Sequence, residues 1–450
     1  MANGSSNGVP AANPYGGVPG GGITLPDYFK PTDSVENNST YFPASEKMGD
    51  DEMRISFVGS NPFPPRRDQA GTAIMVELGK GPKRFFFDLG PGCLRNIVAM
   101  QVPITMVNDI FITHLHGDHY LEIPYLYAFA AWAGRWKPLR IYGPSGPTPE
   151  QGTTAMIDAM KQMLRWHTRS FNIFPIGDGY EIDVTEFDYK DDGGVVYDED
   201  GVVIKHWRRL HGDGASGYRL DWNGLSFVWT GDGRPDEKTI EMAKGADVFV
   251  TEIQPDLPVL QQVKMGMPET LMNNTVDTAH TPHYAAGYMM KQVDPKVAMV
   301  THVALDEAMV PEMVAGIRTH YDGLFQFGAP DVVVVNAQKD AIWTREAALP
   351  EGANAASPSK DEAKYLFDIG PGHLEVEWPK ARIPYDDFQD PEYRKKVELD
   401  KELYYPADVD RDIVHELPDP FKIEIPKMIA QKAAEKIKEK GAKIKEKLGR

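Results

Sequence analysis

One short segment constrains the fold more than any other part of the chain. Residues Thr113–His119 contain three histidines and one aspartate within seven positions. They follow the apolar run Ile110–Ile112, which is typical of a buried strand, and Gly117 predicts that the strand gives way to a loop. Neutral imidazole and carboxylate are good ligands for a divalent ion such as zinc, and burying four such groups without partners would be costly. The segment therefore predicts a strand that leads into a metal-binding loop.

Composition limits the class of protein. The chain has 450 residues, of which 42% are hydrophobic, so it can bury the core of one large or two modest domains. Its net charge of −18 opposes general binding to the phosphate backbone of nucleic acids. Cys93 is the only cysteine, so no intrachain disulfide is possible. We therefore expect a cytoplasmic protein, or a periplasmic one if a signal peptide was removed, without the ~18–20 apolar residues of a membrane span.

Strand and helix patterns alternate along the chain. Residues 72–78 and 84–92 predict one hairpin, and 217–222 and 225–229 predict another that turns at Asn223-Gly224. Helices are expected at 93–101 and 120–136. In each half of the chain several strands end in His or Asp. This pattern predicts an α/β protein with two similar layers that face each other and gather polar groups at one edge.

Three regions differ in composition. Residues 1–50 are rich in Gly, Asn, Pro and Ser and predict a flexible N-terminal arm, 51–345 form the α/β domain, and 346–450 form a C-terminal extension. The extension ends at 427–448 in an amphipathic helix. Its glutamates dilute the basic face, which favours docking or dimerisation over binding to a membrane surface.

Further motifs match a known family in order and spacing. They are Phe87-Asp88-Leu89-Gly90, Tyr142-Gly143-Pro144, His211 six residues before Gly217-Tyr218-Arg219, Thr230-Gly231-Asp232, and Thr301-His302. With the Thr113–His119 segment, they resemble the ribonuclease Z branch of the metallo-β-lactamase superfamily over roughly residues 54–340. Each motif alone occurs in many unrelated proteins, but all six in this order are specific to the family. The resemblance implies an αββα sandwich with N- and C-terminal extensions that acts as a metal-dependent hydrolase.

The resemblance also implies a dinuclear metal site. One ion would be held by His114, His116 and His211, the other by Asp118, His119 and His302, with Asp232 bridging the two. Seven ligands leave positions open for a bridging water, as in catalytic rather than structural sites. We expect zinc, with manganese or iron as alternatives. Related di-iron members usually carry Glu where this chain has His116.

The same resemblance places Asp118, His280 and Glu252 among the catalytic residues. His280 would donate a proton or stabilise an oxyanion, and Glu252 would orient it. The chain departs from the family pattern here, since Thr251-Glu252-Ile253 replaces His-Glu-Ala and Pro282 is unusual. Asp88 has two interpretations, as a turn-capping residue or as a carboxylate that orients a metal-binding histidine.

The departures from the family bear on the substrate. Family members that process tRNA carry a protruding basic arm, whereas residues 147–205 here are interrupted by an acidic loop. The segment 256–279 is expected to act as a lid or substrate wall. We therefore predict hydrolysis of a small-molecule ester, lactone, phosphodiester or sulfate ester, with nucleic acid an unlikely partner and a homo-oligomer, a dimer, as the assembly. The alternatives are a tRNA 3′-processing endoribonuclease and a non-catalytic metal-binding member.

Overall fold

The computed structural model describes residues 40–81, 83–171, 176–256, 270, 276, 278–329 and 332–350. Most of the predicted N-terminal arm and of the C-terminal extension, including the helix predicted at 427–448, lies outside these residues, as does most of the predicted lid. Of the described residues, 40–123, 141–156 and 184–350 form one compact unit, and 124–140 and 157–183 belong to a second.

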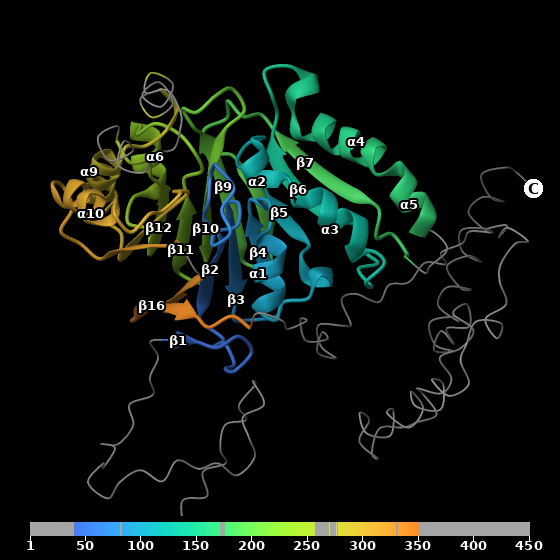
Figure 1. Cartoon of the computed structure of the whole chain (residues 1–450), viewed down its shortest axis with the longest axis horizontal. Coiled ribbons are helices and arrows are strands. Elements are labelled where there is room, and N and C mark those ends of the chain that lie inside the picture. Colours follow the sequence, from blue (N-terminus) through green and yellow to red (C-terminus); the bar gives the residue numbers. More distant parts are fainter. Residues whose placement is uncertain are drawn as a thin grey trace, which may run out of the picture. The chain divides into compact units, whose positions relative to one another are not determined.

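The chain forms two β-sheets with helices (Figure 1). One sheet has the strand order β1-β16-β15-β2-β3-β4-β5-β6-β7, and the other β14-β13-β12-β11-β10-β9-β8. The strands are β1 Thr40–Tyr41, β2 Met53–Gly59, β3 Ala73–Leu78, β4 Arg84–Phe87, β5 Asp109–Phe111, β6 Leu139–Pro144, β7 Ile182–Phe187, β8 Val195–Glu199, β9 Val202–Arg208, β10 Ser216–Trp222, β11 Leu225–Trp229, β12 Val248–Glu252, β13 Val297–Thr301, β14 Phe325–Phe327, β15 Val333–Ala337 and β16 Ile342–Ala347. The helices that the structure describes with bounds are α1 Cys93–Ala99, α2 Gly117–Tyr120, α3 Ile123–Ala130, α4 Thr153–Met163, α5 Arg165–Phe171, α6 Glu237–Ala243, α9 His283–Val293 and α10 Val310–Arg318.

The main core lies between the two sheets. Its buried side chains come from the first sheet, such as Phe87 and Phe111, and from the second, such as Tyr218 and Phe227. The ring centroids of Phe87 and Phe227 lie 5.1 Å apart, and those of Phe111 and Tyr218 lie 5.7 Å apart. Such tilted aromatic pairs add to the stabilisation from apolar burial.

A second core forms on the other face of the second sheet. There, Val228, Phe249 and Val300 of the sheet pack in one cluster with Met290 of α9 and Met313 of α10. Figure 1 shows α6, α9 and α10 beside the strands β11 and β12. The predicted fold class, an α/β protein with two facing layers, is confirmed.

Most local predictions hold, and one helix is shorter than expected. β10 and β11 are antiparallel, and both turn residues have the positive φ that a tight hairpin needs, 51° at Asn223 and 77° at Gly224. The helix predicted at 120–136 is wrong in extent, because α3 ends at Ala130. Gly134 has a φ of 115°, and the N–H of Arg135 donates to the carbonyl of Ala130, which closes the helix end.

Candidate metal centre

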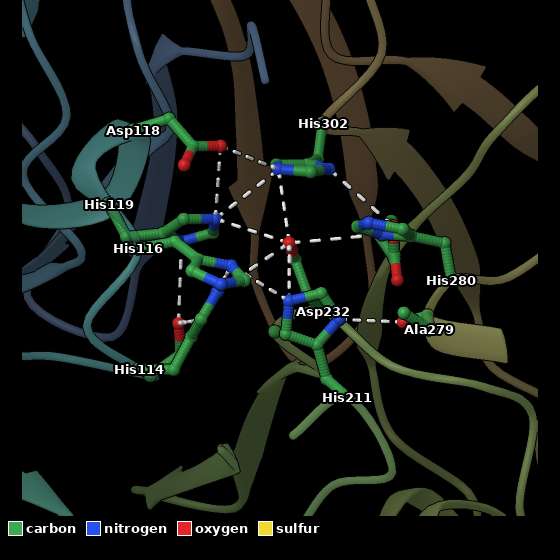
Figure 2. Close-up of polar contacts among 12 residues, drawn as sticks. His114, His116, Asp118, His119, His211, Asp232, Ala279, His280 and His302 are labelled. Atoms are coloured by element: carbon green, nitrogen blue, oxygen red, sulfur yellow. Dashed lines mark hydrogen bonds and ion pairs between the residues drawn. The ribbon is translucent and has the colours of Figure 1, made fainter. Parts of the chain in front are cut away.

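The predicted ligands come from strand ends of both sheets. His114, His116, Asp118 and His119 lie on the loop after β5 and on the short helix α2. His211, Asp232 and His302 follow β9, β11 and β13, and Glu252 is the last residue of β12. Because β11, β12 and β13 are parallel, their carboxyl ends meet at one edge. The structure therefore brings these side chains together, and Figure 2 shows the histidines, Asp118 and Asp232 among them.

Asp232 lies at the centre of the cluster. Its Oδ2 atom is 3.2 Å from Nε2 of His302, 3.4 Å from Nε2 of His119, 3.7 Å from Nε2 of His211 and 3.8 Å from Nε2 of His114. The side chain is 2% exposed, and its Oδ1 atom has no hydrogen-bond partner. A buried carboxylate oxygen without a donor is costly unless a cation is bound to it.

The ligand atoms fall into groups of a size that suits a metal ion. His114, His116, His211 and Asp232 form one group and Asp118, His119 and His302 another, in each of which the ligand atoms lie within 4.8 Å of one another. The ring nitrogens of His116 and His211 are 3.0 Å apart, and those of His119 and His302 are 3.2 Å apart. Tetrahedral coordination with bonds of ~2.0–2.1 Å separates ligand nitrogens by roughly 3.3 Å, so the residues present fit metal ions.

A third group was not anticipated from the sequence as a metal site. Asp232, Glu252, His280 and His302 also place ligand atoms within 4.8 Å of one another. Glu252 is fully buried and connects this group. Its Oε2 atom is 2.7 Å from Nδ1 of His280, and its Oε1 atom accepts a 2.6 Å hydrogen bond from the N–H of Gly233. The roles of His280 and Glu252 stay predictions.

Other buried groups hold the histidine rings in place. Oδ2 of Asp88 lies 2.9 Å from Nδ1 of His119, and Asp88 also accepts hydrogen bonds from the backbone and hydroxyl of Thr113. The carbonyl of Ala279 lies 2.6 Å from Nδ1 of His211. Such contacts fix the ring and leave Nε2 to face the centre. The structure therefore favours the interpretation of Asp88 as an orienting carboxylate, while Ala279 carries no sequence signal for its role.

The electrostatics of the cluster favour cation binding. Burial lowers the pKa of His114 well below its usual range, so this ring is neutral and ready to act as a ligand. Burial opposes charge on His302 as well, but Asp232 and a hydrogen bond to Asp118 raise its pKa to about 10. Although burial raises the pKa of Asp232, His302 and His119 hold it well below the usual value. A metal ion bound by these residues would displace the proton from His302.

The fold and the cluster define the class of protein. A double-sheet α/β sandwich whose strand ends gather histidines and aspartates in groups that could hold metal ions is the framework of a metal-dependent hydrolase. The family model of the metallo-beta-lactamase superfamily matches residues 68–302, and the chain belongs to this superfamily, in its ribonuclease Z-like branch. The family and the enzyme class predicted from the sequence motifs are both confirmed.

Three comparisons describe the relationship. The chain is 27% identical over 327 residues to ribonuclease BN of Proteus mirabilis, covering 60% of this chain and 96% of that protein. It is 30% identical over 281 residues to ribonuclease Z of Mycobacterium marinum, covering 60% of this chain and 91% of that protein. The solved metallo-beta-lactamase fold protein YhfI of Bacillus subtilis superposes with a TM-score of 0.46 at 16% identity, over 65% of this chain and 100% of that one.

Within the described part of the chain, every helix falls short of the length and apolar character needed to cross a membrane.

Proposed function

We propose that this chain is a dinuclear, zinc-dependent hydrolase of phosphodiester bonds. The observation that carries the proposal is the arrangement of ligand atoms in two groups that meet at Asp232. Phosphodiesters belong to the ester-type substrates predicted from the sequence, and relatives named as ribonucleases act on this bond. Esters, lactones and sulfate esters are the competing substrate classes, and a non-catalytic metal-binding member is the competing function.

The proposed ligands divide between two ions. His114, His116 and His211 would hold one, Asp118, His119 and His302 would hold the other, and Asp232 would contribute to both. Imidazole and carboxylate suit zinc, while manganese and iron accept the same ligands less selectively. When bound, two such ions lower the pKa of a water molecule and neutralise developing charge on the attacked phosphate.

His280 is proposed to supply a proton to the departing oxygen. Burial opposes its charge, but Glu252 raises the pKa of His280 above the usual value. The 2.7 Å contact from Nδ1 to Glu252 leaves Nε2 to donate to substrate, and the side chain is 12% exposed. A positioned imidazolium of this kind acts as a general acid.

A second candidate function is tRNA 3′-end processing. Identities of 27–30% to proteins named ribonuclease BN and ribonuclease Z favour it. The net charge of −18 and the acidic loop in place of a basic arm within 147–205 favour a smaller substrate. We propose a small phosphodiester as the substrate and a homodimer as the assembly.

One screen separates these possibilities. The zinc-loaded protein is assayed with bis(4-nitrophenyl) phosphate, a lactone, an aryl ester, a sulfate ester and a precursor tRNA, beside the Asp232→Ala variant. We expect zinc-dependent release of nitrophenol from the diester and an intact tRNA precursor. Efficient tRNA cleavage would establish the second candidate function. Turnover of only the lactone, the ester or the sulfate ester would show that the enzyme cleaves that bond and not a phosphodiester. Bound zinc with no turnover of any reporter would favour the non-catalytic metal-binding alternative.

A further inference from the structure

A small pocket opens directly beside the first group of predicted ligands. It has a volume of about 160 Å³, and its lining includes His114, His116 and His211. An engineered cavity of ~150 Å³ accepts a benzene-sized molecule, so this pocket has room for one ring-sized group. A substrate group that binds in this pocket would therefore lie next to the bond that faces the candidate metal centre.

A second part of the pocket lining is held in place by hydrogen bonds. Pro144 and Ser145 come from the end of β6, where the N–H of Ser145 donates a 2.7 Å hydrogen bond to the carbonyl of Phe187. The Ser145 hydroxyl accepts a 3.3 Å hydrogen bond from the N–H of Tyr189. A hydroxyl with this partner still has its own proton and one lone pair for a ligand.

A third part of the lining is the loop 212–215, which follows His211. Gly214 has a φ of 99°, and a Cβ atom there would lie 3.1 Å from the carbonyl oxygen of Ser145. Only glycine adopts this conformation readily and lets the loop pass so close to Ser145. The close approach places this loop directly beside Ser145 in the pocket lining.

The charge of the pocket is unusual for a site that takes a phosphate ester. Asp213 is its one carboxylate, and neither lysine nor arginine is among the lining residues. The Asp213 side chain is exposed and makes no hydrogen bond or ion pair with the described residues. Gln151 contributes an amide whose oxygen accepts a 3.3 Å hydrogen bond from the hydroxyl of Thr148. The pocket therefore offers hydrogen bonds and one negative charge.

We propose that this pocket binds one of the two alcohol groups of the phosphodiester. The bound group is neutral and rich in hydroxyls, such as a polyol or a sugar ring. Asp213 determines this specificity. This inference rests on the proposed phosphodiesterase function. The carboxylate accepts hydrogen bonds from hydroxyl groups and repels a group that carries a second phosphate. The Ser145 hydroxyl and the Gln151 amide supply the remaining polar partners.

The test compares two reporters that differ by one phosphate. These are 4-nitrophenyl glyceryl phosphate and the same diester with a phosphate on the glyceryl group, and kcat/KM is measured for the zinc-loaded full chain. We expect the wild type to prefer the uncharged glyceryl group. In Asp213→Asn, the ratio of kcat/KM for the uncharged reporter to that for the phosphorylated reporter should fall roughly three- to tenfold. In Asp213→Lys, this ratio should fall further or drop below one.

The control is Asp322→Asn, which removes the same charge from the loop between α10 and β14, outside the pocket lining, and should leave the ratio unchanged. Turnover of both reporters with the same ratio in wild type, Asp213→Asn and Asp213→Lys would overturn the specificity role while leaving the phosphodiesterase intact. If neither reporter nor bis(4-nitrophenyl) phosphate is hydrolysed, the proposed function itself is wrong and this inference is wrong with it.

Discussion

The indole Nε1 of Trp229 donates a 2.9 Å hydrogen bond to Oδ2 of Asp88, the same oxygen that lies 2.9 Å from Nδ1 of His119. Trp229 ends β11 in the second sheet, and Asp88 follows β4 in the first. The hydrogen bond therefore joins the two sheets directly behind a predicted metal ligand. Asp88 is fully buried and has a φ of 61°, a strained conformation that its several hydrogen bonds hold in place.

Asp88→Asn should weaken metal binding. Asparagine keeps the size of the side chain but loses the charge that orients the His119 ring, and loss of such a partner typically costs 10–100-fold in metal affinity. Competition with a chromophoric chelator measures the change. Trp229→Phe is the matched control, because it removes one donor to Asp88 and leaves the carboxylate on His119. It lowers stability by the lost hydrogen bond, about 1 kcal/mol, and further by the cavity that the smaller ring leaves in the core. Equal zinc affinity in Asp88→Asn and wild type would contradict the orienting role.

The role of Asp88 also shows where prediction from sequence ends. The turn after 84–87 and the hairpin at Asn223-Gly224 could be predicted because their signals lie within a few residues. The contacts of Asp88 with Thr113 and Trp229 span 25 and 141 positions, and no local pattern encodes them. The carbonyl of Ala279 beside His211 is missed for the same reason, since a backbone group carries no residue signature.

The candidate metal ligands could be proposed from the sequence because the family motifs place histidines and aspartates at fixed spacings. Strands that end in His or Asp indicate a shared edge once the sheet is parallel there, as β11, β12 and β13 are. The extent of the helix after the metal loop could not be predicted from apolar spacing. The backbone closure at Gly134 ends it sooner.

Asp232→Ala should abolish turnover and lower the zinc content below two ions per chain. Its Oδ2 atom lies within 3.2–3.8 Å of four histidine nitrogens, so both predicted ion positions lose a ligand. Atomic emission measures the metal, and circular dichroism verifies the fold. His320→Ala serves as a control because His320 is exposed and lies outside the cluster. A variant that retains two ions and full activity would rule out a bridging Asp232.

His280→Gln should slow the reaction in a way that depends on the leaving group. If His280 donates a proton to the departing oxygen, loss of the imidazole costs roughly 10²–10⁴-fold with alkyl leaving groups. Nitrophenolate needs little protonation, so its release should fall less than about tenfold. Rates for a series of diesters of increasing alcohol pKa provide the measurement. Glu252→Gln should give the same trend more weakly, and a uniform loss across the series would indicate that His280 acts as a ligand instead.

His206 should make the protein less stable in mild acid. Its side chain is 1% exposed, and burial lowers its pKa to about 4, although Asp191, Asp192 and Asp188 partly oppose this. Unfolded histidine titrates near pH ~6.5, so between that pH and 4 only the unfolded state gains the proton. Stability is therefore lost as the pH falls through this window, by about 2 kcal/mol at pH 5.

The measurement is urea unfolding of wild type and His206→Phe at pH 7 and pH 5. Phenylalanine fits the apolar contact with Phe187, whose ring centroid lies 3.9 Å from that of His206, and it cannot gain a proton. The variant should lose about 2 kcal/mol less than wild type between the two pH values. The histidines of the candidate metal centre are the same in both proteins, so their contribution cancels in the difference. His320→Phe, at an exposed position, should behave as wild type.

The candidate ligands lie on both sheets, with four after β5 of the first and three after β9, β11 and β13 of the second. Bound ions would then cross-link the two sheets, and the sheets could move apart only after the ions had dissociated. Phe111→Ala, which changes the core and no candidate ligand, would increase the rate of zinc dissociation. The rate of zinc dissociation would thus report on the packing between the two sheets. Selection for catalytic activity would then also act on the residues of the core between them.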